Sequence, residues 1–367
     1  MFARSHLQLA ERYLTAAAFW RYCTVSLQAP HSGNDLQGAA LWSLAVYRWG
    51  LGGAMFDPSQ DHRWAVILAG GEGLRLRLLT RFVSGDDRPK QFCPFSGGRT
   101  LLSDTARRIG RLFSAERTVF SLVHSHELYY AKELENVPPE RMFVQPADRG
   151  TLPAILYSLL RLIRGDKRAV AAFFPTDHHF FEEERFLAGM ELAFAAAEAH
   201  SHTVILMGAP ATYAATDYGW IEVEAASSRH FPTSFLRVKN FWEKPARQVA
   251  EELLDRGCIW NTFVMVGRAE AFLNRIRSAA PALCQAFASS ENIGVEQETL
   301  IVRAIYEQIP PVDFSQSVLS SIPRTLGVFC LGDVGWSDVG DPQRLLEAMT
   351  QTGERSEWFD AWRQEAM

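Results

Sequence analysis

Paired cysteines are missing from this sequence. Its 367 residues include five cysteines, and no two of them form a CxxC pair. An odd, scattered set is typical of free thiols in a reducing compartment and argues against a disulfide framework. Two histidine pairs, His124 with His126 and His178 with His179, lack the cysteine or carboxylate cluster that would complete a zinc set. We therefore expect buried or free thiols at Cys23, Cys93, Cys258, Cys284 and Cys330.

Long apolar runs and an excess of positive charge are also missing. The best candidate span, residues 38–47, has half of the roughly 20 apolar residues that a membrane helix needs. Residues 1–18 lack the uninterrupted apolar region of a secretory signal. The formal net charge is -5, whereas a dedicated nucleic-acid binder shows a basic excess. We predict a cytoplasmic protein with no membrane partner and no nucleic-acid partner.

Residues 1–60 differ from the rest of the chain and are predicted to be a helical extension of unknown role. Helix patterns at residues 7–27 and 41–49 are separated by a turn-rich break. Two interpretations remain open. The segment is either an appended arm, whose apolar side chains would pack on something such as a second subunit of a homo-oligomer, or an upstream translation that the cell does not use, with Met55 as the start.

From residue 64 onward, strand and helix patterns alternate. Alternation of this kind predicts an α/β domain with a doubly wound, mostly parallel sheet, which we assign to residues 61–350, followed by a tail at 351–367. The expected strands are 64–69, 118–123, 141–144, 169–174 and 204–207, and the expected helices are 100–113, 127–135, 152–164 and 182–200.

After Pro210 the alternation breaks down. Strands at residues 218–223 and 235–242 have no clear helix between them, which predicts a small antiparallel addition to the sheet. A strand at 260–266, helices near 269–279 and 300–307, a late strand at 325–331 and a closing helix at 342–349 complete the prediction.

The clearest chemical signal is the glycine-rich sequence GGEGLRL at residues 70–76, directly after the first strand. Glycines at the carboxyl end of a strand let main-chain N–H groups approach a phosphate or a base. The third glycine of a dinucleotide loop is missing, and no Walker lysine follows. Arg75 and Lys90 belong to the same connection, and their charges would offset the charge of a triphosphate.

These residues resemble the signature of the sugar-phosphate nucleotidyltransferases, and most closely the mannose-1-phosphate guanylyltransferase branch. Further segments resemble that family in the same order along residues 64–340. They are PKQF at 89–92, QPADRGTLPAI at 145–155, FPTDH at 174–178, DYGWI at 217–221, EKP at 243–245, WN at 260–261 and WSDVG at 336–340. The resemblance implies a Rossmann-like nucleotidyltransferase fold.

The resemblance also implies a role for each matching residue. GTP and mannose 1-phosphate would be the substrates and Mg2+ the cofactor, because Mg2+ takes one or two carboxylates together with substrate phosphates. The catalytic residues would be Arg75, Lys90 and Asp177, with Asp177 and Asp338 as metal ligands. The nucleotide would bind to Gly70, Gly71, Gly73, Gln145, Gly150 and Thr151. The sugar phosphate would bind to Gly219, Glu243, Lys244 and Asn261.

The chain departs from the family pattern at three places. Leu74, Arg77 and Leu78 replace a threonine, a tryptophan and a proline, Asp148 replaces an asparagine, and Phe263 replaces a glycine. The bulky Phe263 puts the identity of the sugar in question. Two alternatives therefore stay open: a sister transferase that uses glucose 1-phosphate with UTP or dTTP, and a non-catalytic homologue that binds sugar nucleotides.

Overall fold

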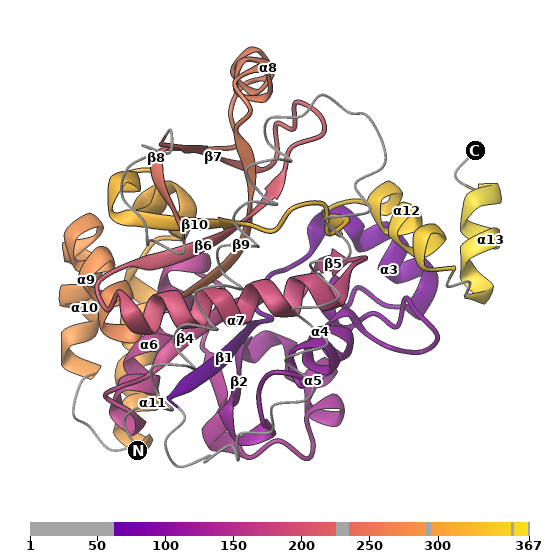
Figure 1. Cartoon of the computed structure of the whole chain (residues 1–367). Coiled ribbons are helices and arrows are strands. Elements are labelled where there is room, and N and C mark those ends of the chain that lie inside the picture. Colours follow the sequence, from indigo (N-terminus) through magenta and orange to yellow (C-terminus); the bar gives the residue numbers. More distant parts are fainter. Residues whose placement is uncertain (1–61, 225–234, 291–294, 354–355, 366–367) are drawn as a thin grey trace, which may run out of the picture.

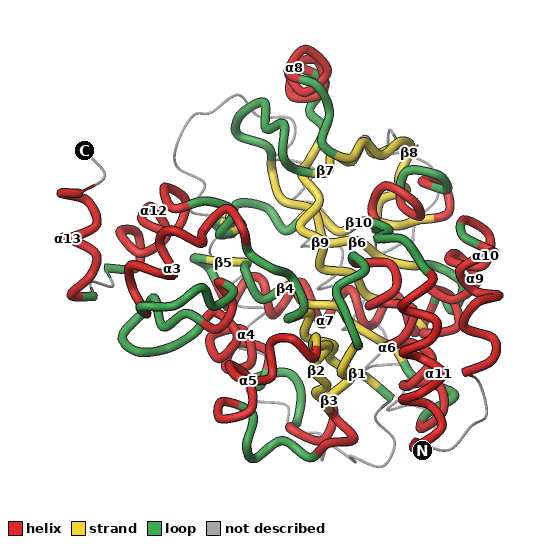
Figure 2. The backbone as a smooth tube through the Cα atoms, turned by 180° about the vertical axis from the view of Figure 1, so that it is seen from behind, coloured by secondary structure: helices red, strands yellow, loops and turns green. Residues whose placement is uncertain are grey.

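The computed structural model describes residues 62–224, 235–290, 295–353 and 356–365. The predicted helical extension, residues 1–60, lies outside this described part, so it stays a prediction. Within the described part, a nine-stranded sheet carries helices on both faces (Figure 1), and the view from behind shows the strands enclosed between them (Figure 2). None of the described helices is long and apolar enough to cross a membrane.

Four parallel strands form one half of the sheet, in the order β3, β2, β1, β4. Each is a short, mainly apolar segment, and β2 is buried along its whole length, as expected for strands covered on both faces. The predicted parallel α/β arrangement is confirmed in this half. The strands are β1 (Arg63–Leu68), β2 (Thr118–Val123), β3 (Met142–Gln145) and β4 (Val170–Pro175).

The other half of the sheet is mixed, which corrects the predicted mostly parallel sheet. Strand β9 lies at the centre and runs antiparallel to both neighbours, β4 and β6. Next come β10, parallel to β6, and then β8 and β7, both in antiparallel pairings. The apolar pattern of a buried strand carries no direction, so the sequence could not reveal that β9 is reversed. These strands are β6 (Val204–Pro210), β7 (Gly219–Val223), β8 (Leu236–Glu243), β9 (Ile259–Arg268) and β10 (Leu326–Cys330).

Aromatic contacts show which helices cover which face. Successive strand residues point to opposite faces. Phe173 of β4 packs edge-on against Phe272 of α9, whereas Phe174 packs against Phe113, which in turn contacts Phe194 of α7. The main covering helices are α4 (Leu101–Ile109), α6 (Thr151–Gly165), α7 (Glu183–Ala199), α9 (Ala269–Ala279), α10 (Pro281–Phe287) and α11 (Val295–Gln308). Two smaller helices are α5 (Glu127–Glu133) and α8 (Arg247–Asp255).

A second, smaller core forms where α3 (Arg77–Ser84) meets α12 (Pro342–Thr352) and α13 (Glu357–Glu365). Trp362 packs edge-on against Phe82, and the Trp358 indole donates a hydrogen bond to the carbonyl of Phe95 at 3.0 Å. The segment predicted as a tail, residues 351–367, therefore contains a helix that packs beside the connection after the glycine loop (Figure 1).

Candidate active site

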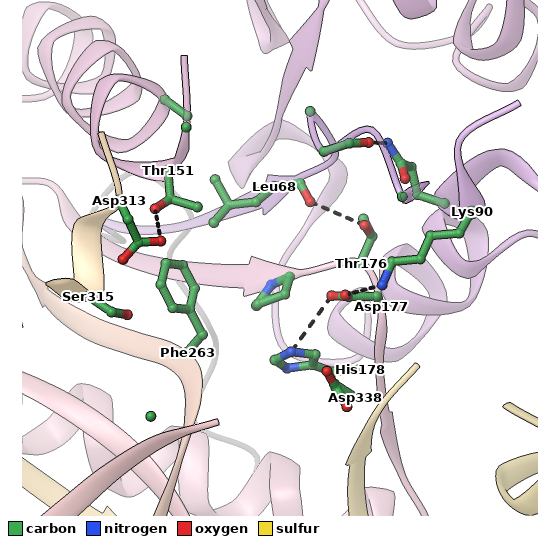
Figure 3. A pocket seen from close by; sticks show the side chains of 18 of the residues that line it. Leu68, Lys90, Thr151, Thr176, Asp177, His178, Phe263, Asp313, Ser315 and Asp338 are labelled. Atoms are coloured by element: carbon green, nitrogen blue, oxygen red, sulfur yellow. Dashed lines mark hydrogen bonds and ion pairs between the residues drawn. The ribbon is translucent and has the colours of Figure 1, made fainter. Parts of the chain in front are cut away.

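A cavity of about 360 Å³ opens at the carboxyl ends of β1, β3 and β4, and every residue predicted for the site lines it. Ligands bind at this edge in open α/β sheets. The close-up shows side chains from several strands and helices converging on the cavity (Figure 3). The convergence is a finding, while the role of each residue stays a prediction. The predicted residues are Gly70, Gly71, Gly73, Arg75, Lys90, Gln145, Gly150, Thr151, Asp177, Gly219, Glu243, Lys244, Asn261 and Asp338.

The glycine loop is held in place from the segment that carries Lys90. Gly73 has a φ of 63°, and a side chain there would begin 2.9 Å from the main-chain nitrogen of Lys90. The Gln91 amide donates hydrogen bonds to the carbonyls of Ala69 at 3.1 Å and Gly71 at 2.7 Å. Glycine is thus required at residue 73, and contacts within the protein fix the conformation of the loop.

Lys90 and Asp177 form a close ion pair inside the cavity. The Lys90 ammonium lies 2.6 Å from a carboxylate oxygen of Asp177 and donates to the carbonyl of Val339 at 2.8 Å. Burial alone would raise the pKa of Asp177, but the charge of Lys90, with help from His178, lowers it to about 2. Asp177 is therefore ionised at neutral pH, as a metal ligand must be. Burial lowers the pKa of His178.

Asp338 reaches the same place through a two-stranded sheet. Strands β5 (His178–Phe180) and β11 (Trp336–Asp338) pair antiparallel, with Asp338 opposite His178. The main-chain N–H of Val339 also donates to the carbonyl of Asp177 at 2.6 Å. Two aspartates 161 positions apart in sequence are thereby joined at the main chain.

Arg344 was missed by the sequence analysis. Its guanidinium lies 2.7 Å from carboxylate oxygens of both Asp338 and Asp217, and it stacks over the Tyr218 ring at 4.7 Å. The Tyr218 hydroxyl donates to the same oxygen of Asp338 at 2.8 Å. Burial would lower the pKa of Arg344, but these acidic partners raise it overall, so it is a permanent cation. No local pattern in the first turn of α12 indicates this role.

The two aspartates fit the donor set of magnesium. Mg2+ takes one or two protein carboxylates and completes its shell with water and substrate phosphate oxygens. Asp177 and Asp338 supply two carboxylates beside the glycine loop. The described residues contain no group of three or more histidine, cysteine or acidic side chains placed to hold a metal.

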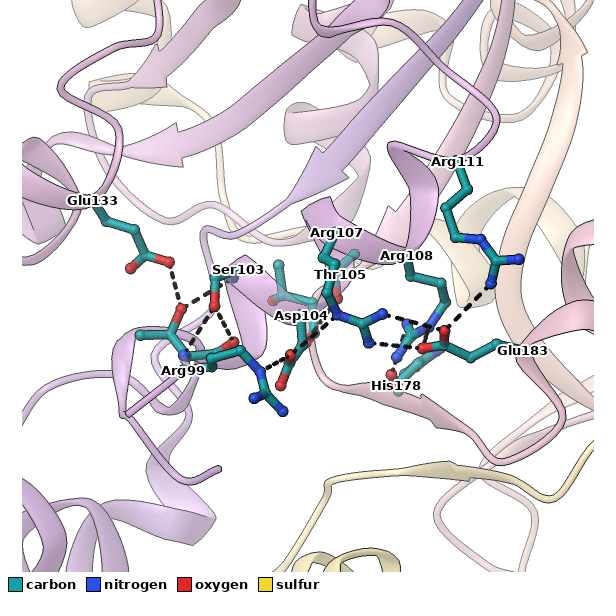
Figure 4. Close-up of polar contacts among 12 residues, drawn as sticks. Arg99, Ser103, Asp104, Thr105, Arg107, Arg108, Arg111, Glu133, His178 and Glu183 are labelled. Atoms are coloured by element: carbon teal, nitrogen blue, oxygen red, sulfur yellow. Dashed lines mark hydrogen bonds and ion pairs between the residues drawn. The ribbon is translucent and has the colours of Figure 1, made fainter. Parts of the chain in front are cut away.

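A polar network fixes the strand that begins directly after Asp177 (Figure 4). Glu183 of α7 accepts hydrogen bonds at 3.0 Å from both Arg107 and Arg108 of α4. Arg108 is 5% exposed and also donates to the carbonyl of His178 at 3.2 Å. Burial would raise the pKa of Glu183, but the two arginines lower it. A buried charge is tolerated because it is paired and hydrogen-bonded, and it ties both helices to β5.

On the nucleotide side, Gln145 is oriented by its protein partners. Its amide nitrogen lies 3.3 Å from the carbonyl of Leu122, which can only accept, so its oxygen must be the atom that accepts from the Tyr306 hydroxyl at 3.0 Å. The amide nitrogen also donates to the Ser121 hydroxyl at 3.2 Å. Gln145 is 2% exposed. Ser121 lines the cavity together with Gln145, and the sequence analysis missed it.

Gly150 and Thr151 form the start of α6. Gly150 has φ 81° and ψ −179°, a conformation open essentially only to glycine, and a side chain there would begin 2.6 Å from the carbonyl of Val312. Thr151 accepts from the main chain of Phe314 at 2.8 Å. The departure at Asp148 is accommodated, because its carboxylate accepts from the N–H of Gly150 at 2.8 Å. The N-terminus of this 15-residue helix faces the cavity, where it favours an anion.

The sugar-phosphate side is built by the start of β7 and the middle of β9. Gly219 and Asn261 are opposite each other across this pair, and a side chain on Gly219 would begin 2.9 Å from a carboxylate oxygen of Glu243. Burial and the nearby Asp313 raise the pKa of Glu243, although Lys244, at 3.2 Å, opposes the shift. Glu243 and Asn261 thus offer carboxylate and amide acceptors beside the exposed ammonium of Lys244.

The departures Leu74 and Leu78 lie next to the glycine loop on the protein surface. Leu74 and Leu78 are exposed, at 61% and 73%. Arg75 is also largely exposed and lies 3.4 Å from Asp217. Arg75 therefore sits at the rim, where side-chain movement would be needed for it to contact a phosphate deep in the cavity.

Residues 64–355 match the sequence family described as nucleotidyl transferase, so the chain belongs to that family. The resemblance found in the sequence is confirmed. Among its relatives are mannose-1-phosphate guanylyltransferase 2 of Escherichia coli O157:H7, 28% identical over 303 residues, which cover 79% of this chain and 61% of the relative, and the alginate biosynthesis protein AlgA of Pseudomonas aeruginosa, 28% identical over 281 residues, which cover 75% and 56%.

The fold is similar to a crystal structure from Thermus thermophilus described as a mannose-1-phosphate geranyltransferase. The TM-score is 0.66, with 24% identity over 79% of this chain and 80% of that chain. At this identity the likeness shows the fold alone. The chain spans about 60% of the length of curated relatives that it matches.

Proposed function

We propose that the chain transfers a nucleotidyl group from GTP to mannose 1-phosphate, releasing pyrophosphate and forming GDP-mannose. One observation carries the proposal: a single cavity is lined by the glycine loop, the Lys90–Asp177 pair, Asp338 and the Glu243–Lys244 group. That combination suits two phosphorylated substrates that meet at a cation-rich centre. The choice of GTP and mannose 1-phosphate is supported by the names of the relatives.

The reaction is an in-line displacement. A phosphate oxygen of the sugar 1-phosphate attacks the α-phosphorus of the nucleotide, forming a new P–O bond. The bond from the α-phosphorus to the oxygen that bridges to the β-phosphate breaks, and pyrophosphate leaves with its electron pair. The displacement needs no covalent enzyme intermediate. The rate acceleration would therefore come from positioning of the two substrates and from charge stabilisation.

Each side chain has a place in that displacement. Lys90 offsets charge at the centre of the cavity, Arg75 approaches the leaving pyrophosphate from the rim, and Lys244 binds the attacking phosphate. The N-terminus of α6 favours the negative charge of the nucleotide. Asp177 and Asp338 would hold Mg2+, which would supply positive charge next to the substrate phosphates.

The test is pyrophosphate release across four nucleoside triphosphates and a panel of sugar 1-phosphates. Among fully hydroxylated hexose 1-phosphates, we expect GTP with mannose 1-phosphate to give the highest kcat/KM. We expect Asp177→Asn to lower kcat by at least about 100-fold, the usual effect of losing a preorganised charge-stabilising group. A higher value for glucose 1-phosphate with UTP or dTTP would assign the sister activity. Nucleotide binding without release by the wild-type chain would instead favour the non-catalytic homologue.

A further inference from the structure

Phe263 adopts a backbone conformation that a bulky residue rarely takes. It lies in the middle of β9 with a φ of 59°, in the left-handed region that favours glycine. The pairing of β9 with β6 shifts register here, between Leu206 and Gly208, so Phe263 sits in a β-bulge. Bulges turn a side chain away from the direction that regular pleating would give it.

Specific hydrogen bonds hold the bulge. The Thr262 hydroxyl donates to the carbonyl of Met207 at 2.7 Å. It also accepts from the N–H of Val264 at 3.3 Å, and the Asn261 side-chain oxygen accepts from the N–H of Phe263 at 3.2 Å. The strained residue is thus fixed from both sides, and such strain is typically retained where it serves a binding site.

The ring of Phe263 lines the cavity among polar side chains. It contacts Phe314 edge-on, with ring centroids 6.3 Å apart. Around it the cavity wall includes Asn261, Glu243 and Ser315, and Figure 3 shows the ring between Asp313 and the Asp177–His178 pair. A ligand in this half of the cavity therefore meets hydrogen-bonding groups on several sides and an aromatic face on one.

We propose that Phe263 is a specificity-determining residue that selects a sugar 1-phosphate with a deoxygenated carbon opposite the ring. The inference rests on the proposed function. A hydroxyl pressed against the ring would lose its hydrogen bonds to water and gain none, whereas a C–H group loses nothing. Hydroxyls on the other carbons are read by Asn261 and Glu243, and a site that hydrogen-bonds a hydroxyl strongly rejects an analogue without it.

The experiment compares mannose 1-phosphate with its 2-, 3-, 4- and 6-deoxy analogues, using GTP and pyrophosphate release by the full chain. We expect one analogue to match or exceed mannose 1-phosphate in kcat/KM, while the others fall by about 100-fold or more. Asparagine tolerates the left-handed backbone and offers hydrogen bonds. Phe263→Asn should therefore lower the ratio of kcat/KM for the preferred analogue to kcat/KM for mannose 1-phosphate by about tenfold.

Two further variants make the outcome decisive. Phe263→Leu keeps an apolar side chain and should keep the preference, and Leu128→Ala, at an exposed position outside the cavity, should leave every ratio unchanged. Equal losses for all four analogues, or the same ratio in Phe263→Asn as in the wild type, would overturn the proposal. A Phe263→Asn effect on the choice of nucleotide alone would also overturn it. Absence of pyrophosphate release by the wild type with any substrate pair would instead refute the proposed function itself.

Discussion

Replacing Lys90 by methionine removes the closest cation of Asp177, and the result can be measured as stability against pH. In the wild-type chain, burial raises the pKa of Asp177, but Lys90 and His178 lower it from the ordinary 3.8 to about 2. A carboxylate with a lowered folded-state pKa stabilises the fold above its unfolded pKa, and that stability disappears as the pH falls through the folded pKa. The difference between the folded and unfolded pKa of Asp177 contributes about 2 kcal/mol to the free energy of unfolding, and this contribution is lost as the pH falls from about 4 to about 2.

In Lys90→Met, burial is no longer opposed by the ammonium, so the pKa of Asp177 rises above 3.8. The folded state then binds the proton more tightly than the unfolded state, and the free energy of unfolding falls as the pH rises from about 4 to 6. At neutral pH the unpaired carboxylate should lower the free energy of unfolding by about 1 to 2 kcal/mol, less than a fully buried charge would, because the Asp177 side chain is 26% exposed. The pH slope contributed by this pair therefore changes sign.

The assay is urea unfolding between about pH 3 and pH 7 for wild type, Lys90→Met, Asp177→Asn and the double variant. In the Asp177→Asn background, Lys90→Met should have an effect that does not depend on pH, because the titrating group is gone. The reasoning would be refuted if the free energies of unfolding of wild type and Lys90→Met differed by the same amount at every pH. That result would mean that Lys90 contributes packing and does not control the charge of Asp177.

Four further predictions follow from the geometry. Gly150→Ala should lower the free energy of unfolding by about 2 to 3 kcal/mol in urea, because its backbone is essentially restricted to glycine. Phe263→Gly should be more stable than Phe263→Ala by about 1 kcal/mol, the reverse of the usual order, since only glycine relieves the positive φ. Arg344→Ala should lower the free energy of unfolding by about 3 kcal/mol, and millimolar Mg2+ should stabilise it more than the wild type, because a cation that competes for Asp338 is gone. Lys244→Ala should raise the KM for mannose 1-phosphate about tenfold or more with little change for GTP.

Matched controls separate these effects from general damage. Gly85→Ala also has a positive φ but meets no neighbouring atom, so it should cost only about 1 kcal/mol. Arg247→Ala removes an exposed ion pair and should respond to Mg2+ as the wild type does. The geometric argument for Gly150 fails if Gly150→Ala lowers the free energy of unfolding no more than Gly85→Ala does. Equal magnesium responses in wild type and Arg344→Ala would contradict the electrostatic link to Asp338.

The site could be predicted further than the sheet because its residues follow strand ends. Gly70, Gln145 and Asp177 lie at or just after the ends of short apolar strands, and parallel strands bring their carboxyl ends to one edge. The sequence therefore contained enough to place these side chains together. The direction of β9 could not be predicted in the same way. Its central segment, residues 263–266, is as apolar as the neighbouring strands, and its antiparallel pairings are made with residues far away in the chain.

The missed residues depend on tertiary contacts that leave no local pattern. Arg344 lies on the first turn of a helix, where an exposed arginine is ordinary, and its function follows only from where α12 packs. Tyr306 reads as a core residue of α11, and its hydroxyl reaches Gln145 across 161 positions. The departure at Phe263 was visible in the sequence, but the bulge that turns it into the cavity was not.

The reversed central strand has a consequence for how this binding pocket can change. In a purely parallel sheet, ligands are met by loops that follow the strands, and loops tolerate insertions. Here Asn261 and Phe263 belong to a strand whose sides are hydrogen-bonded to β4, β6 and β7. An insertion there would shift the register of the whole sheet and turn core residues outward. New sugar preferences are therefore accessible mainly through exchange of single side chains on β9.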